Sequence, residues 1–209
     1  MNEIEKLDQL IDMLGASISD VESCKEDIKH LDEDFLQRYP DYSNPNLSSD
    51  WKKMLDNIKS DYLYFRRRNY VKTVFSSIEG ILFAMKRILL IHSDKLSDEE
   101  IINLQEYKLV GPPEHKLKKK IHFLKTDENV KFVIRTYEKA KTTGFTTNLK
   151  EDDWEKFRLS IEIRNRITHP KHSSDLLISE DEIETVMQAH DWFFKVFNDL
   201  QKNEINLFG

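Results

Sequence analysis

Hydrophobic residues recur every three or four positions through most of the chain, a spacing that predicts helices almost throughout. The first stripe predicts one long helix over residues 2–38, ended by Pro40, which has no N–H to continue a helix. Its apolar positions are Ile4, Leu7, Ile11, Leu14, Ile18, Val21, Ile28 and Phe35. Because the steps alternate between three and four as in a heptad repeat, the stripe fits either a dimerisation or partner-binding arm or a helix that packs on the core.

A second set of stripes predicts either one long helix over residues 51–91 or two nearly collinear helices, starting from a cap at Ser49 or Asp50. Its length and apolar content make it the expected centre of a helical bundle. Ser97 and Ser179 are each followed three residues later by Glu, which is the capping-box pattern of a helix start. The first box predicts a short helix that ends near Tyr107, and the second predicts the final helix.

Two further helices are predicted over residues 129–141 and from Asp153 onward, and residues 142–150 read as a loop. With only 5 Gly and 5 Pro, the chain has little of the turn chemistry of a large sheet. The sequence therefore predicts an all-α fold. We expect a helical extension over residues 1–48, followed by a helical domain over residues 49–209.

Charge is distributed unevenly along the chain, although the net charge is −6 at pH 7. Residues 1–50 hold 4 Lys or Arg against 13 Asp or Glu, and the remainder holds 28 against 25. The later part is therefore not acidic, and RNA contact needs only a local basic face. Cys24 is the only cysteine, which excludes an internal disulfide and fits a cytoplasmic location. The most apolar stretch, residues 71–91, is interrupted by four charged residues, so no transmembrane helix is expected.

The densest group of chemically useful side chains lies at residues 163–171, at the end of a predicted helix. Pro170 disfavours helical backbone at the preceding residue, so His169 is expected at or just past the helix end. On a continuous helix, five residues turn Arg164 and His169 well away from each other. If the helix unwinds at residue 167 or 168, the imidazole can fold back beside the guanidinium. A fixed cation that holds phosphate would then lie beside a side chain that titrates near neutral pH.

The string Arg164-Asn165-x-x-x-His169-Pro170 resembles the R-x4–6-H motif of HEPN domains, in which Asn often follows the Arg. The likeness covers roughly residues 51–200. It implies an HEPN-like up-and-down helical bundle with a long N-terminal helix. The best-known toxins of the family often carry Tyr two residues after the His, where this chain has Lys171.

The resemblance implies a metal-independent endoribonuclease, a toxin or phage-defence effector that cleaves RNA to 2′,3′-cyclic phosphate ends. Arg164 and His169 are its expected catalytic residues, usually assembled across a homodimer. Asn165 is expected to orient one of them or to cap the helix end, and Glu79 resembles an acidic residue that faces the motif from an early core helix. Neither a cofactor nor a metal is expected, and an antitoxin or regulatory partner is possible within this family.

Arg166 and Lys171 are expected to hold flanking RNA phosphates. Two other basic clusters, residues 66–68 and 115–120, fit either RNA contacts or solvated surface, with the second expected in a loop. Glu79 lies between Ile78 and Ile81, so it is either buried and paired or a boundary residue that reaches solvent.

Two other functions fit the same residues. A non-catalytic HEPN module would bind RNA, nucleotide or a protein partner without turnover. A structural role would leave Arg164 and His169 both buried and paired within one protomer. Catalysis predicts instead that both side chains are exposed in one cleft, without a carboxylate partner that saturates them. Binding alone predicts a cleft from which His169 is turned away or blocked.

Overall fold

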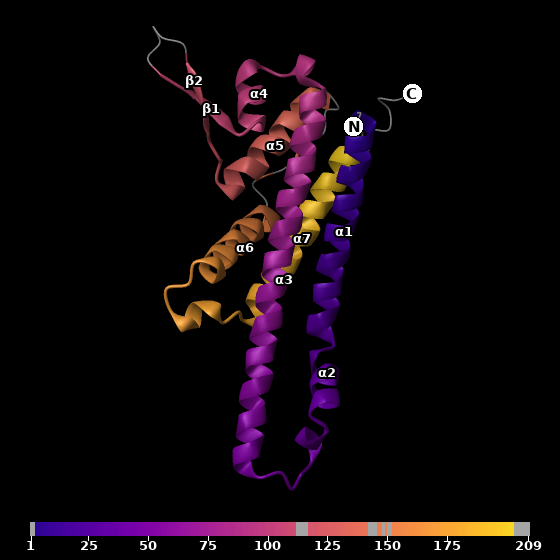
Figure 1. The fold of residues 1–209 in the computed structure, drawn as a ribbon, viewed down its shortest axis with the longest axis vertical. Helices are drawn as coiled ribbons and strands as arrows, with labels where there is room; N and C mark the ends of the chain where they lie inside the picture. The colour runs from indigo at the N-terminus through magenta and orange to yellow at the C-terminus, as the bar shows by residue number, and fades with distance from the viewer. Residues whose placement is uncertain (1–2, 112–116, 142–145, 148, 150–151, 203–209) are drawn as a thin grey trace. The chain divides into compact units, whose positions relative to one another are not determined.

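The computed structural model describes residues 3–111, 117–141, 146–147, 149 and 152–202, and most of this chain is helical (Figure 1). The predicted all-α class is therefore confirmed. The α-helices are α1 (Glu3–Lys29), α2 (Leu31–Arg38), α3 (Ser49–Ile91), α4 (Asp98–Leu104), α5 (Thr126–Lys141), α6 (Asp152–Thr168) and α7 (Glu180–Lys202). Short 3-10 helices are η1 (Pro40–Ser43), η2 (Ser93–Lys95) and η3 (Ser173–Leu176), and the two strands are β1 (Tyr107–Val110) and β2 (Lys118–Ile121).

The helix predicted over residues 2–38 is divided at His30, so the prediction of one unbroken helix is wrong at this point. α1 ends at Lys29 and α2 begins at Leu31. The His30 imidazole lies 3.1 Å from a carboxylate oxygen of Glu26 and 3.0 Å from one of Glu33. These contacts hold the side chain at the break, which no Gly or Pro marks in the sequence.

The central helix α3 runs unbroken through 43 residues, the first of the two predicted arrangements. Ser48 accepts two hydrogen bonds from its first turn: Trp51 N–H donates to Ser48 Oγ (3.4 Å), and Lys52 N–H donates to the Ser48 carbonyl (2.9 Å). The predicted cap at Ser49 or Asp50 is therefore one or two residues too late. Both predicted capping boxes, at Ser97 and Ser179, are present.

The chain divides into two compact units, and it passes between them within α3, α6 and α7. Unit 1 contains Met1–Ser77 and Glu162–Met187, and unit 2 contains Ile78–Ile161 and Gln188–Gly209. Residues 1–48 thus share a unit with parts of the predicted helical domain. The proposed boundary at residue 48 stays a prediction.

Unit 1 contains an antiparallel pair of helical segments, in which α2 and the end of α1 lie along the first part of α3 (Figure 1). Cys24 Sγ lies 3.6 Å from Thr73 Oγ1, and farther along the pair Asp32 accepts an ion pair from Lys59 Nζ over 2.7 Å. Val21 and Phe35, at 0% and 1% exposed, come from the predicted heptad stripe. From Val21 onward this stripe therefore packs on the core.

Unit 2 is built around an aromatic cluster from α6 and α7. The ring centres of Trp154 and Trp192 are 5.6 Å apart, and those of Phe157 and Phe193 are 6.0 Å apart. All four side chains are buried. Packing of this kind stabilises a core beyond simple burial of apolar area. It follows from the apolar stripes that the sequence shows on both helices.

Unit 2 also contains a β-hairpin where the sequence predicted a loop. β1 and β2 pair antiparallel with Tyr107 opposite Ile121 and Val110 opposite Lys118. Gly111 follows β1 with φ +143°, a conformation that a side chain strongly disfavours. Three successive lysines carry no apolar alternation, which explains why the pattern gave no strand at residues 118–120.

Several predicted segment ends lie elsewhere or outside the described residues. α4 ends at Leu104 rather than near Tyr107, and α5 begins at Thr126 rather than residue 129. Residues 115 and 116 of the basic run, most of the predicted 142–150 loop, and residues 203–209 lie outside the described chain. Residues 173–176 form η3.

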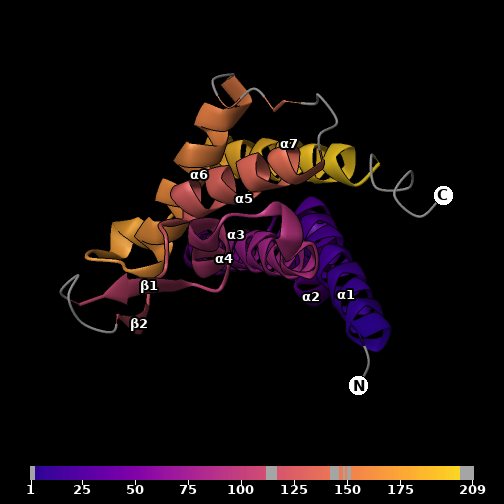
Figure 2. The same cartoon turned by 90° about the horizontal axis from the view of Figure 1, so that it is seen from above.

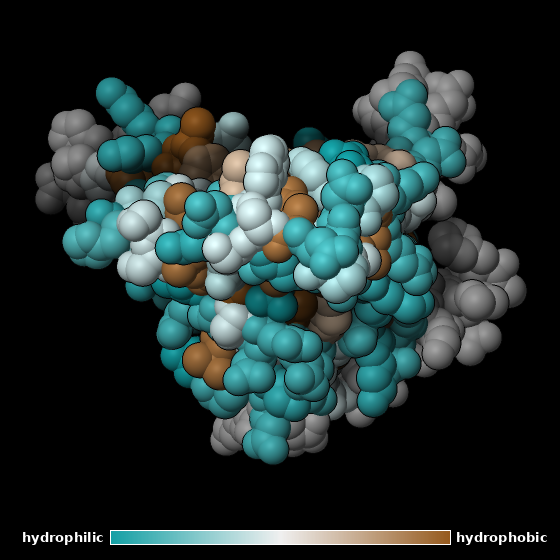
Figure 3. All heavy atoms as spheres, turned by 90° about the horizontal axis from the view of Figure 1, so that it is seen from below, coloured by the Kyte–Doolittle hydropathy of each residue, from teal (hydrophilic) through white to brown (hydrophobic). Residues whose placement is uncertain are grey.

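Hydrophilic residues dominate the face drawn in Figure 3, with hydrophobic residues scattered among them. This matches a chain in which 33% of residues are charged. Within the described residues, no helix has both the length and the apolar character needed to span a membrane.

Candidate functional site

The Arg164–His169 motif lies on the last two turns of α6 and just beyond them, entirely in unit 1. Ile163 and Ile167, at 7% and 3% exposed, turn toward the core and fix the helix in place. The backbone N–H of His169 still donates to the Asn165 carbonyl over 3.0 Å, and Pro170 then ends the ladder. His169 is thus the first residue past the helix, as the sequence predicted.

Arg164 is half-buried, and Asn165 and Phe75 are among the residues that hold its side chain. Its Nη1 donates to Asn165 Oδ1 over 3.0 Å, and its Cζ lies 5.2 Å from the centre of the Phe75 ring. A guanidinium at this distance from an aromatic face is attracted by the ring. The predicted orienting role of Asn165 has this geometric support, since one amide oxygen reaches the Arg164 side chain.

His169 is exposed, and its imidazole makes no hydrogen bond to any residue that the structure describes. The structural alternative required His169 to be buried and paired, so His169 does not fit that alternative.

The helix does not unwind before His169, which is a difference from the arrangement considered on sequence grounds. α6 continues through Thr168, whose Oγ1 donates to the Arg164 carbonyl over 2.7 Å. Five helical steps rotate a side chain by about 500°, which places Arg164 and His169 about 140° apart around the axis. A continuous α6 therefore does not bring both groups to one side of the same helix.

The segment that follows the motif is fastened by three arginines, which we name the arginine clamp: Arg67, Arg68 and Arg166. Their Nη1 atoms donate to three consecutive carbonyls: Arg68 to Leu176 (3.0 Å), Arg166 to Leu177 (2.9 Å) and Arg67 to Ile178 (2.7 Å). Hydrogen bonds from a charged donor are stronger than neutral ones. The clamp therefore fixes the return of the chain from the motif to α7.

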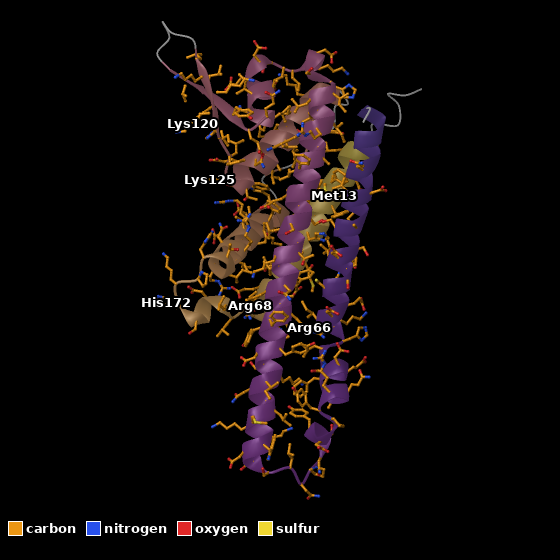
Figure 4. The ribbon with its side chains drawn as sticks, viewed as in Figure 1. Met13, Arg66, Arg68, Lys120, Lys125 and His172 are labelled. Atoms are coloured by element: carbon orange, nitrogen blue, oxygen red, sulfur yellow. The ribbon has the colours of Figure 1, made fainter. Side chains whose placement is uncertain are left out.

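The Arg66–Arg68 cluster makes hydrogen bonds within the protein that its sequence did not predict. Arg66 does not take part in the clamp. It donates to Tyr62 Oη and to Asp34 Oδ2 over 2.7 Å each, and it also contacts the Asp27 carbonyl. Figure 4 shows Arg66 and Arg68 leaving α3 in different directions. The three arginines are partly buried and donate to protein oxygens, so the cluster is not simply solvated surface, whereas a contact with RNA phosphate stays a prediction. The carbonyl partners of Arg68 and Arg67 lie 108 and 111 residues away, beyond any local sequence signal.

Arg166 is also paired with α7. Its Nη2 lies 2.5 Å from Glu182 Oε1, while Glu182 Oε2 accepts the Ser179 N–H over 2.9 Å. The same carboxylate thus completes the capping box of α7 and holds the clamp. The predicted contact between Arg166 and an RNA phosphate stays a prediction, and such a phosphate would have to use the remaining N–H groups of the guanidinium.

The turn beyond Pro170 is organised by Asp175. One carboxylate oxygen accepts the backbone N–H groups of Lys171 (2.7 Å) and His172 (3.0 Å). These two hydrogen bonds, that of Lys171 first, lower the pKa of the Asp175 carboxyl below its ordinary value of 3.8. The Lys171 and His172 side chains are exposed, and Figure 4 labels His172 at the outer side of this turn. The Lys171 side chain is therefore accessible to a phosphate group that approaches from solvent.

Glu79 lies in unit 2, whereas the motif lies in unit 1. Its side chain is exposed and lines a pocket of about 320 Å³ together with Lys86, Glu106 and Asn129. The expectation that Glu79 faces the motif stays a prediction. Lys86, which also lines this pocket, was not predicted as a site residue. A lysine among the buried positions of α3 could have indicated it, because a buried charge needs a partner.

Among the residues that the structure describes, no group of three or more His, Cys, Asp and Glu side chains comes together as a metal site. Comparison with family models, with curated proteins and with solved structures finds no match to this chain.

Proposed function

We propose that the chain is an HEPN-type, metal-independent endoribonuclease whose active residues are Arg164 and His169. The observation that carries this proposal is the exposed His169 imidazole, one residue past α6 and followed by Pro170. Arg164 precedes it by five residues and is held by Asn165 and Phe75. The residue types, their spacing and their accessibility fit RNA cleavage better than a purely structural role.

His169 acts first as the general base in the proposed reaction. The imidazole takes the proton of a ribose 2′-hydroxyl, and the 2′-oxygen attacks the adjacent phosphorus. The bond from phosphorus to the 5′-oxygen breaks, and that oxygen takes a proton from an imidazolium. The products are a 2′,3′-cyclic phosphate and a 5′-hydroxyl. Because the nucleophile belongs to the RNA, the reaction requires no metal-bound water.

Arg164 stabilises the negative charge that grows on the phosphate oxygens in the transition state. A guanidinium already held by Asn165 Oδ1 and the Phe75 ring needs little reorganisation when the substrate binds. Lys171, exposed beyond Pro170, contacts a flanking phosphate. Asn165 acts on the chemistry through Arg164.

The active form is proposed to be a homodimer in which Arg164 of one copy and His169 of the other meet one phosphate. The unbroken α6 supports this, because it turns the two side chains of one copy about 140° apart. A two-fold axis would create two such sites at once. A toxin or phage-defence role, restrained by a partner, follows from the family resemblance.

The second candidate is an HEPN module that binds RNA or another partner without turnover. The same continuous α6 favours it, since one copy alone does not bring its Arg164 and His169 to one side of the helix. The two functions differ in whether RNA is cut.

The test uses a labelled mixed-sequence RNA incubated with purified protein in EDTA. We expect cleavage by the wild type that leaves 2′,3′-cyclic phosphate ends and fails on DNA of the same sequence. Arg164→Ala and His169→Ala should each reduce the rate by about 100-fold or more. His172→Ala, an exposed histidine three residues later, is the matched control and should cut like the wild type. No cutting by folded wild type, or equal cutting by all variants, would reject the nuclease.

A further inference from the structure

The β-hairpin of unit 2 gathers three lysines on one of its faces. Side chains alternate between the two faces of a strand, so opposite residues share a face. Lys108 lies directly opposite Lys120, and Lys118, opposite Val110, falls on the same side. All three side chains are exposed, and none makes an ion pair with another residue of the described chain. Like charges placed directly opposite destabilise a hairpin unless an anion neutralises them.

The hairpin also displays large apolar side chains. Ile121 is 61% exposed and Phe123, two residues after it, is 68% exposed. Figures 1 and 2 both show the two strands projecting outward beside α4 and α5, and Figure 4 labels Lys120 and Lys125 along this side. By the same alternation Ile121 lies on the face opposite the three lysines, and Phe123 follows past the end of β2. A basic surface with an exposed aromatic ring nearby is typical of proteins that bind single-stranded nucleic acid.

A pocket of about 320 Å³ opens at the base of the hairpin. Glu106, just before β1, and Phe123, just after β2, both line it, and the His122 N–H donates to the Glu106 carbonyl over 2.8 Å. Glu106 has φ +60°, which is uncommon outside glycine, and its carboxylate lies 3.0 Å from the buried Lys86 Nζ. Strained backbone of this sort often marks a binding site.

The polar groups of this pocket are mainly hydrogen-bond acceptors. Glu79 and Glu106 contribute carboxylates, and Lys86 is already engaged by Glu106. Asn129 Oδ1 is buried and meets no donor in the part of the chain that the structure describes. A buried acceptor without a donor is costly, so a ligand that donates hydrogen bonds would be favoured.

We propose that this hairpin and its pocket form a binding site for single-stranded RNA. The phosphates lie on the Lys108–Lys118–Lys120 face, and one unstacked base lies on Phe123 and donates its exocyclic amino group to Asn129 Oδ1. The inference rests on the proposed function for its choice of ligand, and it adds a substrate contact and a base preference. Cytosine carries an amino group where uracil carries a carbonyl, so the site prefers cytosine.

RNA fits these features better than the other ligands of a basic surface. An anionic membrane or an acidic protein would account for the lysines. Neither supplies a flat ring that stacks on Phe123 and also carries an amino group as hydrogen-bond donor. Base recognition by stacking and by hydrogen bonds to the base edge is how proteins read unpaired RNA.

The test measures binding of fluorescein-labelled oligo(C) and oligo(U), each about 12 nucleotides long, a usual length for such sites. The full chain carries His169→Ala throughout, so that the RNA stays intact. We expect tighter binding of oligo(C), by roughly 5-fold or more for one well-placed hydrogen bond. Asn129→Ala should remove this preference, and Phe123→Ala should weaken both oligonucleotides by roughly 5- to 100-fold.

The triple variant Lys108→Gln/Lys118→Gln/Lys120→Gln should weaken both oligonucleotides alike and lower the salt-dependence slope by about 2. Its matched control is Lys53→Gln/Lys72→Gln/Lys195→Gln, which changes three exposed lysines elsewhere and should bind like the parent. Circular dichroism checks that every variant is folded.

Equal RNA binding by the two triple variants would overturn the proposal. A protein that binds phosphatidylserine vesicles but does not bind RNA would overturn it as well. If RNA binds through the hairpin but is never cut by protein with His169 intact, the binding site stands and the nuclease fails. If RNA is cut while the hairpin variants bind RNA like the parent, the nuclease stands and the hairpin binding site fails.

Discussion

The backbone N–H of His169 donates to the carbonyl of Asn165 over 3.0 Å, so α6 keeps its helical ladder up to the residue before Pro170. This bond sets the geometry of the whole motif. With the ladder intact, the Arg164 and His169 side chains leave α6 in different directions. In the homodimer proposed above, the second copy supplies the partner that each side chain lacks within its own copy.

The arginine clamp should stabilise unit 1 measurably. Arg68→Ala removes a charged donor from the Leu176 carbonyl, and we expect the free energy of unfolding to fall by about 1–2 kcal/mol. Urea denaturation followed by circular dichroism gives this value. Lys72→Ala, an exposed residue one turn later on α3, is the control and should change it by less than about 0.5 kcal/mol. Equal effects from both variants would show that the clamp carries no stability.

Asp175 should make the turn after Pro170 sensitive to acid. Its folded-state pKa lies below the ordinary 3.8, because the Lys171 and His172 N–H groups favour the carboxylate. A lowered pKa contributes stability that is present above the unfolded value and is lost as the pH falls through the folded value. The wild type should therefore be more stable than Asp175→Asn at pH 6, and the difference should shrink below about pH 4. A difference that stays constant across this range would contradict the assignment.

The Lys86–Glu106 pair should show strong coupling. Lys86 is buried with its ammonium on Glu106, so Glu106→Gln leaves a charge in the protein interior without its counter-charge. We expect the free energy of unfolding to fall by about 1–3 kcal/mol. The effect is smaller than for a fully buried pair because the Glu106 side chain is partly exposed.

The control for this pair is the double variant Lys86→Met/Glu106→Gln, which removes both charges. It should recover much of the lost free energy of unfolding, and a double-mutant cycle of urea denaturations measures the coupling. Additive effects of the two single substitutions would mean that the pair does not hold the base of the hairpin.

Local signals in the sequence predicted the helices well. Ser97 and Ser179 cap helices through side chains three residues away, so the pattern and the structure concern the same few atoms. Apolar periodicity likewise predicted one long helix or two collinear helices where α3 lies, because its buried side recurs at every turn. The position of His169 just beyond α6 followed from Pro170 alone.

Longer-range features could not be predicted in this way. Arg67 and Arg68 find carbonyl partners more than a hundred residues away, and carbonyls belong to every residue, so no sequence pattern marks them. The first three residues of β2 (Lys118–Ile121) are lysines, which show no alternation of apolar and polar residues. The positive φ of Glu106 could not be predicted either, because the sequence has no glycine at that position.

Mixing two inactive variants tests the central claim most directly. If each phosphate meets Arg164 of one copy and His169 of the other, a dimer of one Arg164→Ala chain and one His169→Ala chain keeps one complete site. Random exchange then restores about one quarter of the wild-type rate of RNA cleavage in EDTA, because half of the dimers each carry one of two sites. The account predicts this recovery. A mixture that exchanges subunits yet stays as inactive as its components, beside active wild type, would contradict it.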